Sequence, residues 1–546
     1  MKIALAQLNY HIGNFESNTE KIIQTLETQC KAGVDLVVFA ELSICGYPPR
    51  DFLEYPEFIS LCNDAALKIA AASQGIACVI GLPITNPIIE GKDLYNAAYF
   101  IADGEIKQII KKALLPNYDV FDEYRYFEPA HEFKCVDYKG HKIALTICED
   151  LWNLGDNPLY KTCPMDELMK ENPDFMINIA ASPFAYNHDE ERIFILSQNC
   201  KKYHMPLFYV NQVGAQTEII FDGGSLVFDK AGDLISEFKY FEEEIQVFDV
   251  ENVQSSIILT ENKNRPTDTQ QVYEALVLGI KDYFKKSGFS KAILGLSGGI
   301  DSALVCTLAC HALGSENVMA VLMPSKYSSD HSIKDAEDLV KNLGCKSTII
   351  PIKDIADTFD ATLAKEFEGL EPNLTEENIQ SRARGVILMA MSNKFGYILL
   401  NTSNKSESAV GYGTLYGDMC GAISVIGDCY KTQVYQLCNY INREKEIIPI
   451  NSIVKPPSAE LRPDQKDSDS LPDYDILDKI LFEYIELKKS SKDIIKSGYD
   501  QDLVDRILKM VNKAEFKRYQ TPPILRVSPK AFGMGRRMPI VGKYLS

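Results

Sequence analysis

Residues 292–302, Ala-Ile-Leu-Gly-Leu-Ser-Gly-Gly-Ile-Asp-Ser, contain the strongest local motif of the chain. The apolar residues at its start are typical of a buried strand, and the residues after the two glycines are expected to begin a helix. Adjacent glycines allow a tight turn and let the backbone approach a ligand closely. The N–H groups at the beginning of such a helix form a site for an anion.

Polar side chains in this motif add further possible ligand contacts. Ser297 and Ser302 offer hydroxyl donors, and Asp301 can hold Mg²⁺ against phosphate oxygens. A simpler interpretation is a glycine-rich turn in which Asp or Ser caps a helix. The mononucleotide pattern that ends in Gly-Lys-Ser/Thr is absent.

The sequence around the motif predicts a regular alternation of strands and helices. We expect a helix at 269–286, and strands, each separated by helical sequence, at 292–296, 318–323, 347–351 and 397–400. This alternation is typical of a doubly wound parallel sheet. Residues 455–473 are rich in Pro, Ser and Asp and are expected to form a long loop.

The first half also alternates, but it includes a hairpin signal. Strands are expected at 35–40, 78–82, 142–147, 175–179 and 206–210, and helices at 17–31 and 58–73. Asp103-Gly104 between two strand-like runs predicts a β-hairpin, so we expect a layered α/β fold and not a purely parallel sheet. A polar segment near 260–268 suggests two domains, 1–250 and 269–546, joined by a linker at 251–268.

Composition excludes several classes of protein. The 546 residues include 57 Lys and Arg against 76 Asp and Glu, a net charge of -19 that argues against a nucleic-acid partner. No apolar run reaches the roughly 18 residues of a membrane span, and the first residues lack the features of a signal peptide. The 14 cysteines include no Cys-x-x-Cys pair, which is typical of reduced thiols in a cytoplasmic protein.

Several motifs of the second half agree, in order along the chain, with one enzyme family. The turn at 297–302 resembles the Ser-Gly-Gly-x-Asp-Ser loop of ATP pyrophosphatases, which bind the pyrophosphate end of ATP and transfer AMP to an acceptor. The further motifs are Glu377–Gly385, Asn401–Glu407, Gly411–Asp418, Gly427–Thr432 and Pro457–Pro463. Together they resemble NAD synthetase from about Thr269 to the C-terminus.

The resemblance implies an adenine nucleotide α-hydrolase-like domain that binds two nucleotides. The residues implied to bind ATP are Gly295, Leu296, Ser297, Gly298, Gly299, Ile300, Asp301, Ser302, Thr402 and Lys431. Those implied to bind deamido-NAD are Asn378, Arg382, Glu407, Tyr412, Gly413, Thr414, Leu415 and Lys517, and those implied to hold Mg²⁺ are Asp301 and Glu407. Taken alone, Lys431 and Lys517 would be expected to be solvated surface charges.

The chemistry of this family suits these residue types. The nicotinate carboxylate of deamido-NAD is a poor electrophile, and transfer of AMP converts it into a mixed anhydride that ammonia can attack. Lysine and Mg²⁺ would offset the charge of the triphosphate in the transition state. A domain that consumes ammonia raises the question of what supplies it.

Three polar residues of the first half suggest an answer. Glu41 and Cys148 directly follow strand-like stretches, and Lys112 lies in the segment Lys111–Tyr118. The thiolate is the reactive form of cysteine, and a nearby lysine can lower the thiol pKa from its ordinary value of about 8.5. A glutamate can take the thiol proton and return it to departing ammonia, while the lysine stabilises the oxyanion.

In this order, Glu41, Lys112 and Cys148 resemble the catalytic triad of the nitrilase (carbon–nitrogen hydrolase) family, in its glutaminase branch. The resemblance covers about Met1–Val250 and implies a nitrilase-like αββα sandwich in which Glu123 is a second carboxylate near Lys112. Each residue also has a structural alternative. Cys148 could be a core cysteine, Glu41 a loop cap and Lys112 a strand-edge charge.

The resemblance further implies that Tyr118 and Ser182 contact glutamine. The family often has Lys or Arg a few residues after the serine to pair with the α-carboxylate, but here Ser182 is followed by Pro-Phe-Ala-Tyr-Asn and then His188. We expect His188 or Arg192 to take that place, while an ordinary loop histidine is the alternative. A histidine contact would weaken as the pH rises.

The whole chain thus resembles the bacterial-type glutamine-dependent NAD synthetases. The resemblance implies that deamido-NAD, ATP, glutamine and water give NAD, AMP, diphosphate and glutamate, with ammonia passed between the domains inside the protein. It also implies a homo-oligomer assembled through the synthetase domains. Two alternatives stay open: another acceptor for the ammonia, and a binding or regulatory protein with inactive copies of both sites.

Overall fold

The computed structural model describes residues 1–154, 158–255, 265–463 and 465–544. The chain forms two compact units, Met1–Arg265 and Pro266–Ser546. Of the predicted linker 251–268, residues 256–264 lie outside the described part of the chain. Within the described residues, no helix combines the length and the apolar character that crossing a bilayer would require.

The first unit is built on two mixed sheets of six strands each. From edge to edge, the strands of one sheet are β14 (Glu244–Asp249), β1 (Lys2–Gln7), β2 (Leu36–Val38), β3 (Ala77–Thr85), β4 (Leu94–Ala102) and β5 (Glu105–Lys111). Those of the other are β13 (Leu234–Glu237), β12 (Leu226–Phe228), β9 (Leu207–Asn211), β8 (Phe175–Ala180), β7 (His141–Ile147) and β6 (Val136–Tyr138). A separate hairpin pairs β10 (Val213–Gln216) with β11 (Ile219–Asp222).

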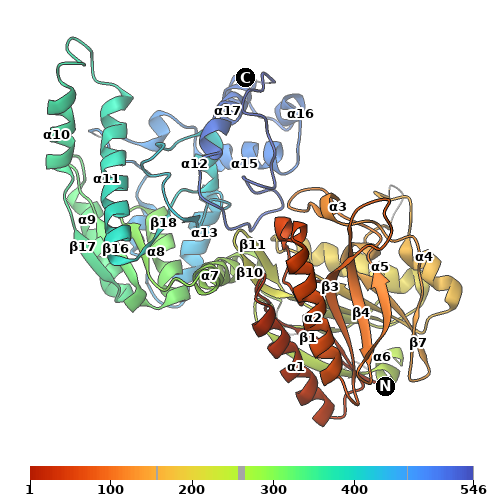
Figure 1. Cartoon of the computed structure of the whole chain (residues 1–546). Helices are drawn as coiled ribbons and strands as arrows, with labels where there is room; N and C mark the ends of the chain where they lie inside the picture. The colour runs from red at the N-terminus through yellow and green to blue at the C-terminus, as the bar shows by residue number, and fades with distance from the viewer. Residues whose placement is uncertain (155–157, 256–264, 464, 545–546) are drawn as a thin grey trace. The chain divides into compact units, whose positions relative to one another are not determined.

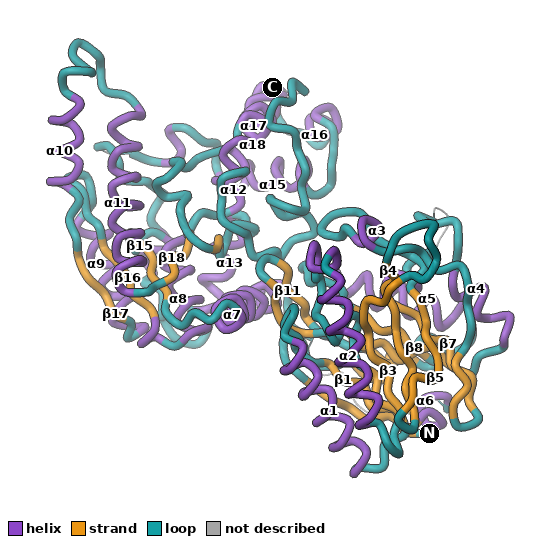
Figure 2. The backbone as a smooth tube through the Cα atoms, in the orientation of Figure 1, coloured by secondary structure: helices purple, strands orange, loops and turns teal. Residues whose placement is uncertain are grey.

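Helices cover the outer faces of the two sheets (Figures 1 and 2). The helices of this unit are α1 (Phe15–Lys31), α2 (Pro56–Ala72), α3 (Glu123–Tyr126), α4 (Pro164–Leu168), α5 (His188–Tyr203) and α6 (Val250–Gln254). Ile22 of α1 and Ile69 of α2 pack with Val37 of the first sheet, whereas α4 and α5 contact the second sheet. Phe100 and Phe208, from different sheets, share one core cluster. The predicted αββα sandwich is therefore confirmed.

The predicted hairpin at Asp103-Gly104 joins β4 to β5. Both residues have positive φ values, 52° and 82°, as a two-residue turn of this handedness requires. β4 and β5 pair antiparallel up to Ala102 and Glu105. β5 ends at Lys111, which pairs with Ala97 of β4, and Ala97 in turn pairs with Leu82 of β3. Leu82 lies beyond the last pair between β2 and β3, Val38 with Val79. Lys112 and Glu41 therefore lie at the same end of the sheet.

The second unit contains a fully parallel sheet of five strands. From edge to edge the strands are β17 (Lys346–Ile349), β16 (Val318–Leu322), β15 (Ala292–Gly295), β18 (Ile398–Asn401) and β19 (Ile423–Ser424). The chain runs from β15 outward to β17 and then crosses to β18 on the other side of β15. This reversal of strand order confirms the predicted doubly wound sheet and places the turn after β15 at the switch point.

Helices pack on both faces of this sheet and also form a smaller core beyond it. The helices are α7 (Asp268–Lys286), α8 (Ile300–Leu313), α9 (Asp330–Leu343), α10 (Lys353–Leu363), α11 (Leu374–Phe395), α12 (Lys405–Val410), α13 (Lys431–Ile441), α14 (Ile450–Val454), α15 (Tyr474–Ile485), α16 (Ser491–Lys496), α17 (Gln501–Lys513) and α18 (Glu515–Arg518). Leu388 of α11 packs on Ile293 of the sheet. α15 and α17 pack together in a separate core. Among the described residues of 455–473, the one helical element is a short 3₁₀ turn, Asp467–Asp469, as predicted for a long loop.

Candidate active sites

Glu41, Lys112 and Cys148 come together from both sheets of the first unit. Glu41 lies in the turn after β2, Lys112 directly follows β5, and Cys148 directly follows β7 as the first residue of a 3₁₀ turn, Cys148–Leu151. All three are at most 6% exposed. The group therefore depends on how the two sheets pack against each other.

The ammonium of Lys112 is enclosed by two carboxylates. Its Nζ donates to Glu41 Oε1 at 2.7 Å and to both oxygens of Glu123 at 2.9 Å. Burial alone would lower the pKa of Lys112, but Glu123 and Glu41 outweigh burial and raise this pKa well above its ordinary value. Lys112 is therefore a permanently charged internal cation and not a strand-edge charge.

The two carboxylates around Lys112 are themselves held by further donors. Asn96 Nδ2 donates to Glu41 Oε1 at 2.7 Å, and the backbone N–H of Ala181 donates to Glu41 Oε2 at 3.1 Å. Tyr47 Oη donates to Glu123 at 2.8 Å. Burial, with a contribution from the neighbouring Glu41, raises the pKa of Glu123 to about 7, although Lys112 opposes this rise. The Glu123 carboxylate therefore binds a proton at a higher pH than an ordinary glutamate does.

Cys148 sits at a sharp turn of the backbone. Its φ is 43°, a left-handed conformation that is unfavourable for a residue with a side chain. Asp150 accepts from the backbone N–H groups of Ala113 and Leu114 at 3.0 and 2.9 Å, and from that of Ile147 at 3.1 Å. One carboxylate thus links the segment after Lys112 to the turn that carries the thiol.

The protonation state of Cys148 differs from the sequence-based expectation. We expected the lysine to lower the thiol pKa, but burial and the negative charge of Glu41 raise it well above its ordinary value, and Lys112 only partly opposes them. Because an uncharged thiol is a weak nucleophile, a nucleophilic role for this sulfur would require a base that takes its proton.

Tyr118 lies beside a carboxylate that sequence reasoning missed. Its Oη donates to Glu149 at 3.0 Å, and Tyr160 Oη donates to the same carboxylate at 3.1 Å. Glu149 is 5% exposed, and burial raises its pKa although Lys112 and both hydroxyls oppose the rise. Its position next to Cys148 in the sequence was the only signal that could have identified it.

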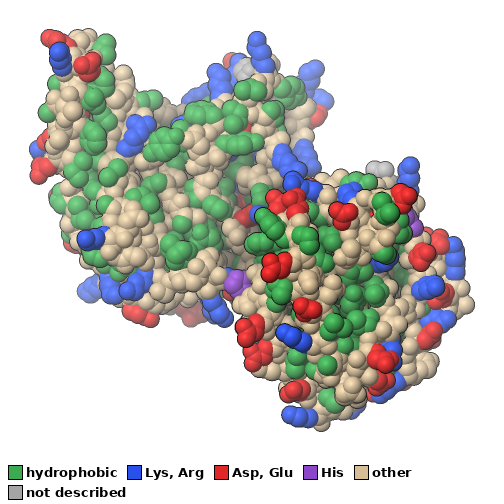
Figure 3. Space-filling view, viewed as in Figure 1, with side chains coloured by type: hydrophobic (Ala, Val, Ile, Leu, Met, Phe, Trp, Pro, Cys, Tyr) green, Lys and Arg blue, Asp and Glu red, His purple; other side chains and the backbone are tan. Residues whose placement is uncertain are grey.

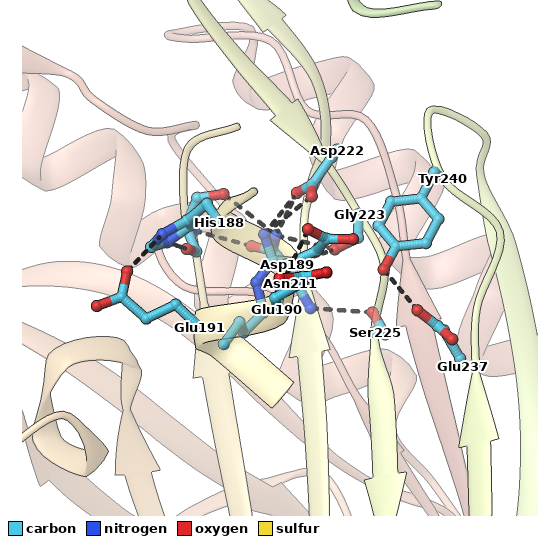
Figure 4. A network of polar contacts seen from close by, with 12 residues as sticks. His188, Asp189, Glu190, Glu191, Asn211, Asp222, Gly223, Ser225, Glu237 and Tyr240 are labelled. Carbon is cyan, nitrogen blue, oxygen red and sulfur yellow. Dashed lines mark hydrogen bonds and ion pairs between the residues drawn. The ribbon is translucent and has the colours of Figure 1, made fainter. Parts of the chain in front are cut away.

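The structure separates the two candidate cations near Ser182. Figure 4 shows His188 beside Glu191, and Asp222 and Gly223 in another part of the same polar network. Arg192 is 1% exposed, donates to both oxygens of Asp222 at 3.0 and 2.9 Å, and reaches the Gly223 carbonyl at 3.1 Å. It is therefore an internal ion-pair residue. His188 instead has Nε2 3.3 Å from Ser182 Oγ, faces Glu191 and stacks on Trp152 at 5.3 Å between ring centroids.

In the second unit, a cavity of about 320 Å³ lies at the glycine-rich turn. The predicted ATP and metal residues that line it are Gly295, Leu296, Ser297, Gly299, Ile300, Asp301, Ser302, Thr402, Glu407 and Lys431, together with Tyr412. Gly298 is part of the turn but not of the lining. Its φ is 80°, and a Cβ there would lie 2.1 Å from the Ser332 carbonyl oxygen, so the tight turn requires glycine.

Acidic groups and one lysine meet inside this cavity. Lys431 pairs with Asp301 and lies 3.6 Å from Glu407, and only 2% of its side chain is exposed, so it is not a solvated surface charge. Burial would lower the pKa of Lys431, but Asp301 and Glu407 raise it. Burial and the charge of Asp301 raise the pKa of Glu407 to about 8.

A fully buried ion group positions Glu407. Lys405, two residues earlier on α12, contacts Asp428 at 2.9 Å, Glu486 at 2.8 Å and Ser528 Oγ at 2.8 Å. These contacts anchor α12, and Lys405 itself does not line the cavity. Sequence reasoning missed Lys405, although it belongs to the quoted motif Asn401–Glu407, and it also missed Arg384, a cavity-lining residue of the motif Glu377–Gly385.

The residues predicted to bind deamido-NAD cluster around the loop 411–418, and most of them lie outside the lining of the cavity. Thr414 Oγ1 donates to Asn378 Oδ1 at 2.7 Å, and Arg382 Nε donates to the Leu415 carbonyl at 3.2 Å. Lys517 Nζ donates to the carbonyls of Gly411 and Gly413 at 2.8 and 2.7 Å. In this structure Lys517 therefore holds the loop.

Comparison with known proteins assigns a family to each half of the chain. The carbon-nitrogen hydrolase family model matches residues 2–256 and the NAD synthase family model matches residues 272–521. Over 98% of both chains, the sequence is 46% identical to a glutamine-dependent NAD(+) synthetase of Synechocystis sp.. The chain belongs to the glutamine-dependent NAD(+) synthetase family. This member of the family is an enzyme with a hydrolase domain and a synthetase domain.

Other relatives extend over the whole chain. A glutamine-dependent NAD(+) synthetase of Thermotoga maritima is 41% identical over 100% of this chain and 99% of its own. The solved structure of the enzyme from Acinetobacter baumannii in complex with ADP is 38% identical, covers 100% of this chain and 99% of its own, and has a TM-score of 0.78. The family resemblance inferred from the motifs is confirmed, whereas the exact domain limits stay a prediction.

We predict that Gly81→Ala will disturb the Glu41 segment. A Cβ at Gly81 of β3 would lie 2.3 Å from the backbone nitrogen of Leu42 and 2.9 Å from the Ala40 carbonyl oxygen. Because the obstacle is backbone, the segment must move, and we expect about 1–3 kcal/mol of destabilisation, measured by chemical denaturation. Gly140→Asn is the control, since nothing lies within 4 Å of that position and asparagine adopts its positive φ of 80° more readily than most residues with a side chain. An unchanged unfolding free energy of Gly81→Ala would contradict this account.

Proposed function

We propose that this enzyme amidates deamido-NAD to NAD with ammonia released from glutamine. The proposal depends chiefly on one observation, which is that the described residues contain two different sites. One holds a thiol beside an internal lysine and two glutamates. The other is a glycine-rich turn of the kind that binds phosphate, with acidic groups and a buried lysine. The first arrangement suits hydrolysis of an amide and the second suits transfer of AMP. The full-length similarity to glutamine-dependent NAD(+) synthetases supports the same reaction.

In the first unit, we infer that Cys148 attacks the side-chain amide carbon of glutamine. Glu41 takes the thiol proton as the carbon–sulfur bond forms, and Lys112 stabilises the oxyanion of the tetrahedral intermediate. Glu41 returns the proton to the amide nitrogen, the carbon–nitrogen bond breaks and ammonia leaves. Water, deprotonated by Glu41, then attacks the thioester, and glutamate and the free thiol are released.

The surroundings of the thiol suit a free amino acid. A zwitterion presents an ammonium and a carboxylate, and a site that selects it needs a partner for each. Glu149, held by Tyr118 and Tyr160, offers the acceptor for the α-ammonium. Ser182 and His188 are our candidates for the α-carboxylate, because Arg192 is already paired with Asp222.

In the second unit, we infer that the turn at 297–302 binds the phosphates of ATP. A carboxylate oxygen of deamido-NAD attacks the α-phosphorus, diphosphate leaves, and ammonia then displaces AMP from the mixed anhydride to give the amide. Lys431, buried and charged, contributes positive charge where the phosphates would lie. The loop 411–418, with Asn378, Arg382 and Lys517, is our candidate for contacts to the dinucleotide.

The residues at this turn also fit Mg²⁺. Asp301 and Glu407 offer hard oxygen donors in a partly buried site. Asp467 is a third carboxyl group nearby, and burial, Asp301 and Asp467 together raise the pKa of Glu407 although Lys431 opposes the rise. A bound Mg²⁺ would supply charge to neutralise the triphosphate.

We further propose a homo-oligomer that assembles through the synthetase unit. Large apolar side chains of this unit are exposed, among them Leu370, Leu374 and Val386, which are 69%, 68% and 65% exposed. Apolar side chains are visible on its surface over α10 and α11 (Figure 3). Association of copies would remove such surface from water.

The central test follows nitrogen through the reaction. With glutamine labelled with ¹⁵N in the amide, ATP and deamido-NAD, we expect labelled NAD, AMP and glutamate in equal amounts by mass spectrometry. Cys148→Ala should stop this transfer but leave synthesis from added ammonium. Cys78→Ala is the control, because Cys78 is a buried cysteine whose pKa is shifted by burial alone. Label that is absent from the NAD formed would refute the coupled reaction.

A second prediction concerns Asp301. Asp301→Asn removes a charge from the cavity, so we expect a loss on the order of 10²-fold or more in NAD formation from either nitrogen source. Glutamine hydrolysis should continue, and Asp360→Asn, on the exposed side of α10, should have no effect. Normal synthesis by Asp301→Asn would exclude the proposed role of this carboxylate.

A third prediction separates the two candidate cations of the glutamine site. His188→Gln should raise the KM for glutamine about tenfold and leave kcat with ammonium unchanged, because a contact worth roughly 1.4 kcal/mol is lost. His188→Arg should restore a low KM that varies less with pH. A glutamine KM that is the same in His188→Gln as in the natural enzyme would show that another residue binds the carboxylate.

A further inference from the structure

Three cysteines of the second unit lie together outside the proposed active site. Cys306 and Cys310 belong to α8, and Cys345 lies between α9 and β17. Their Sγ atoms are all within 4.8 Å of one another. Within the described residues, no other group of three or more His, Cys, Asp or Glu side chains comes this close.

The fold brings these sulfurs together from two elements. Residues four apart on a helix share one face, so Cys306 and Cys310 present their sulfurs in the same direction. Helix α9 ends at Leu343 and is capped by Gly344, with φ 69°, and the chain then passes through Cys345 into β17, which pairs with β16. The three cysteines are 0%, 5% and 8% exposed, so packing holds the group in place.

We propose that Cys306, Cys310 and Cys345 form a binding site for a soft, thiophilic metal ion, represented by Cu(I). Sulfur ligands prefer such ions over hard cations. With metal–sulfur bonds of about 2.3 Å, a trigonal arrangement places the sulfurs about 4.0 Å apart. The observed group needs a contraction of less than about 1 Å to reach that geometry.

The number of donors distinguishes the kind of metal. Zn²⁺ in structural sites takes four protein ligands, and among the described residues no His, Asp or Glu joins the three sulfurs. Three sulfurs satisfy Cu(I) without a fourth ligand. Binding transfers the thiol protons to solvent, and the positive charge of the metal offsets part of the charge of the thiolates. Affinity should therefore fall as the pH is lowered.

Occupation of this site would stabilise the second unit without taking part in its chemistry. None of the three cysteines lines the cavity at the glycine-rich turn. The metal would connect α8, which begins at that turn, to the segment before the edge strand β17. A ligand that binds only the folded state raises its stability, so the thermal midpoint should rise.

The test uses the full-length, reduced protein under anaerobic conditions. Cu(I) is partitioned between the protein and an excess of a chromophoric Cu(I) chelator that outcompetes isolated thiols. We expect the natural chain to retain one equivalent and to unfold at a higher temperature, and we expect Cys310→Ala and Cys345→Ala to lose both effects. Cys438→Ala is the matched control, because Cys438 is also a buried helical cysteine of this unit but lies outside the group.

Alanine is a good helix former, so Cys310→Ala should remain folded, and circular dichroism checks this. Cys345→Ala tests the one sulfur of the group that lies outside the helix. Equal copper retention by Cys310→Ala and Cys438→Ala would overturn the proposal, as would a lack of retention by the natural chain. Preferential retention of Zn²⁺ in a parallel competition would also overturn it, because the three-ligand argument would then be wrong.

Discussion

A lysine ammonium that is almost completely removed from water must be balanced by nearby negative charge, and in the first unit Glu41 and Glu123 provide it. Leaving one member of such a group without its partners costs about 3–5 kcal/mol, so the three side chains constrain one another. Each comes from a different part of the fold: the turn after β2, the end of β5 and the short helix α3. The ion group therefore fixes the geometry around Cys148, and Asp150 transmits that geometry to the turn that carries the thiol.

The second unit uses a similar arrangement for different chemistry. Lys431 lies between Asp301 and Glu407, and Lys405 fixes α12 from behind. In the first unit two carboxylates enclose the lysine inside the domain, whereas in the second the lysine and its two carboxylates line a cavity. In our proposal, the same residue types thus serve a covalent reaction in one domain and bind a nucleotide and its metal in the other.

Much of the architecture could be predicted from local sequence. Four of the five strands after residue 290 and the hairpin at Asp103-Gly104 are encoded by short-range patterns, so they were found within one or two residues, whereas the two-residue strand β19 was missed. The αββα sandwich came from a family resemblance. The state of the Cys148 thiol was predicted wrongly, because it depends on desolvation and on Glu41, which only the folded chain brings near. Similarly, Arg192 was a plausible substrate cation until Asp222, distant in sequence, proved to be its partner.

The raised thiol pKa of Cys148 also affects how long the enzyme can remain active. Peroxides and other oxidants attack the thiolate much faster than the protonated thiol. The other cysteines of the chain are free thiols as well. In our proposal Cys148 is the nucleophile, and a thiol whose pKa is raised and whose residue is 6% exposed reacts with such oxidants more slowly than a resting thiolate would.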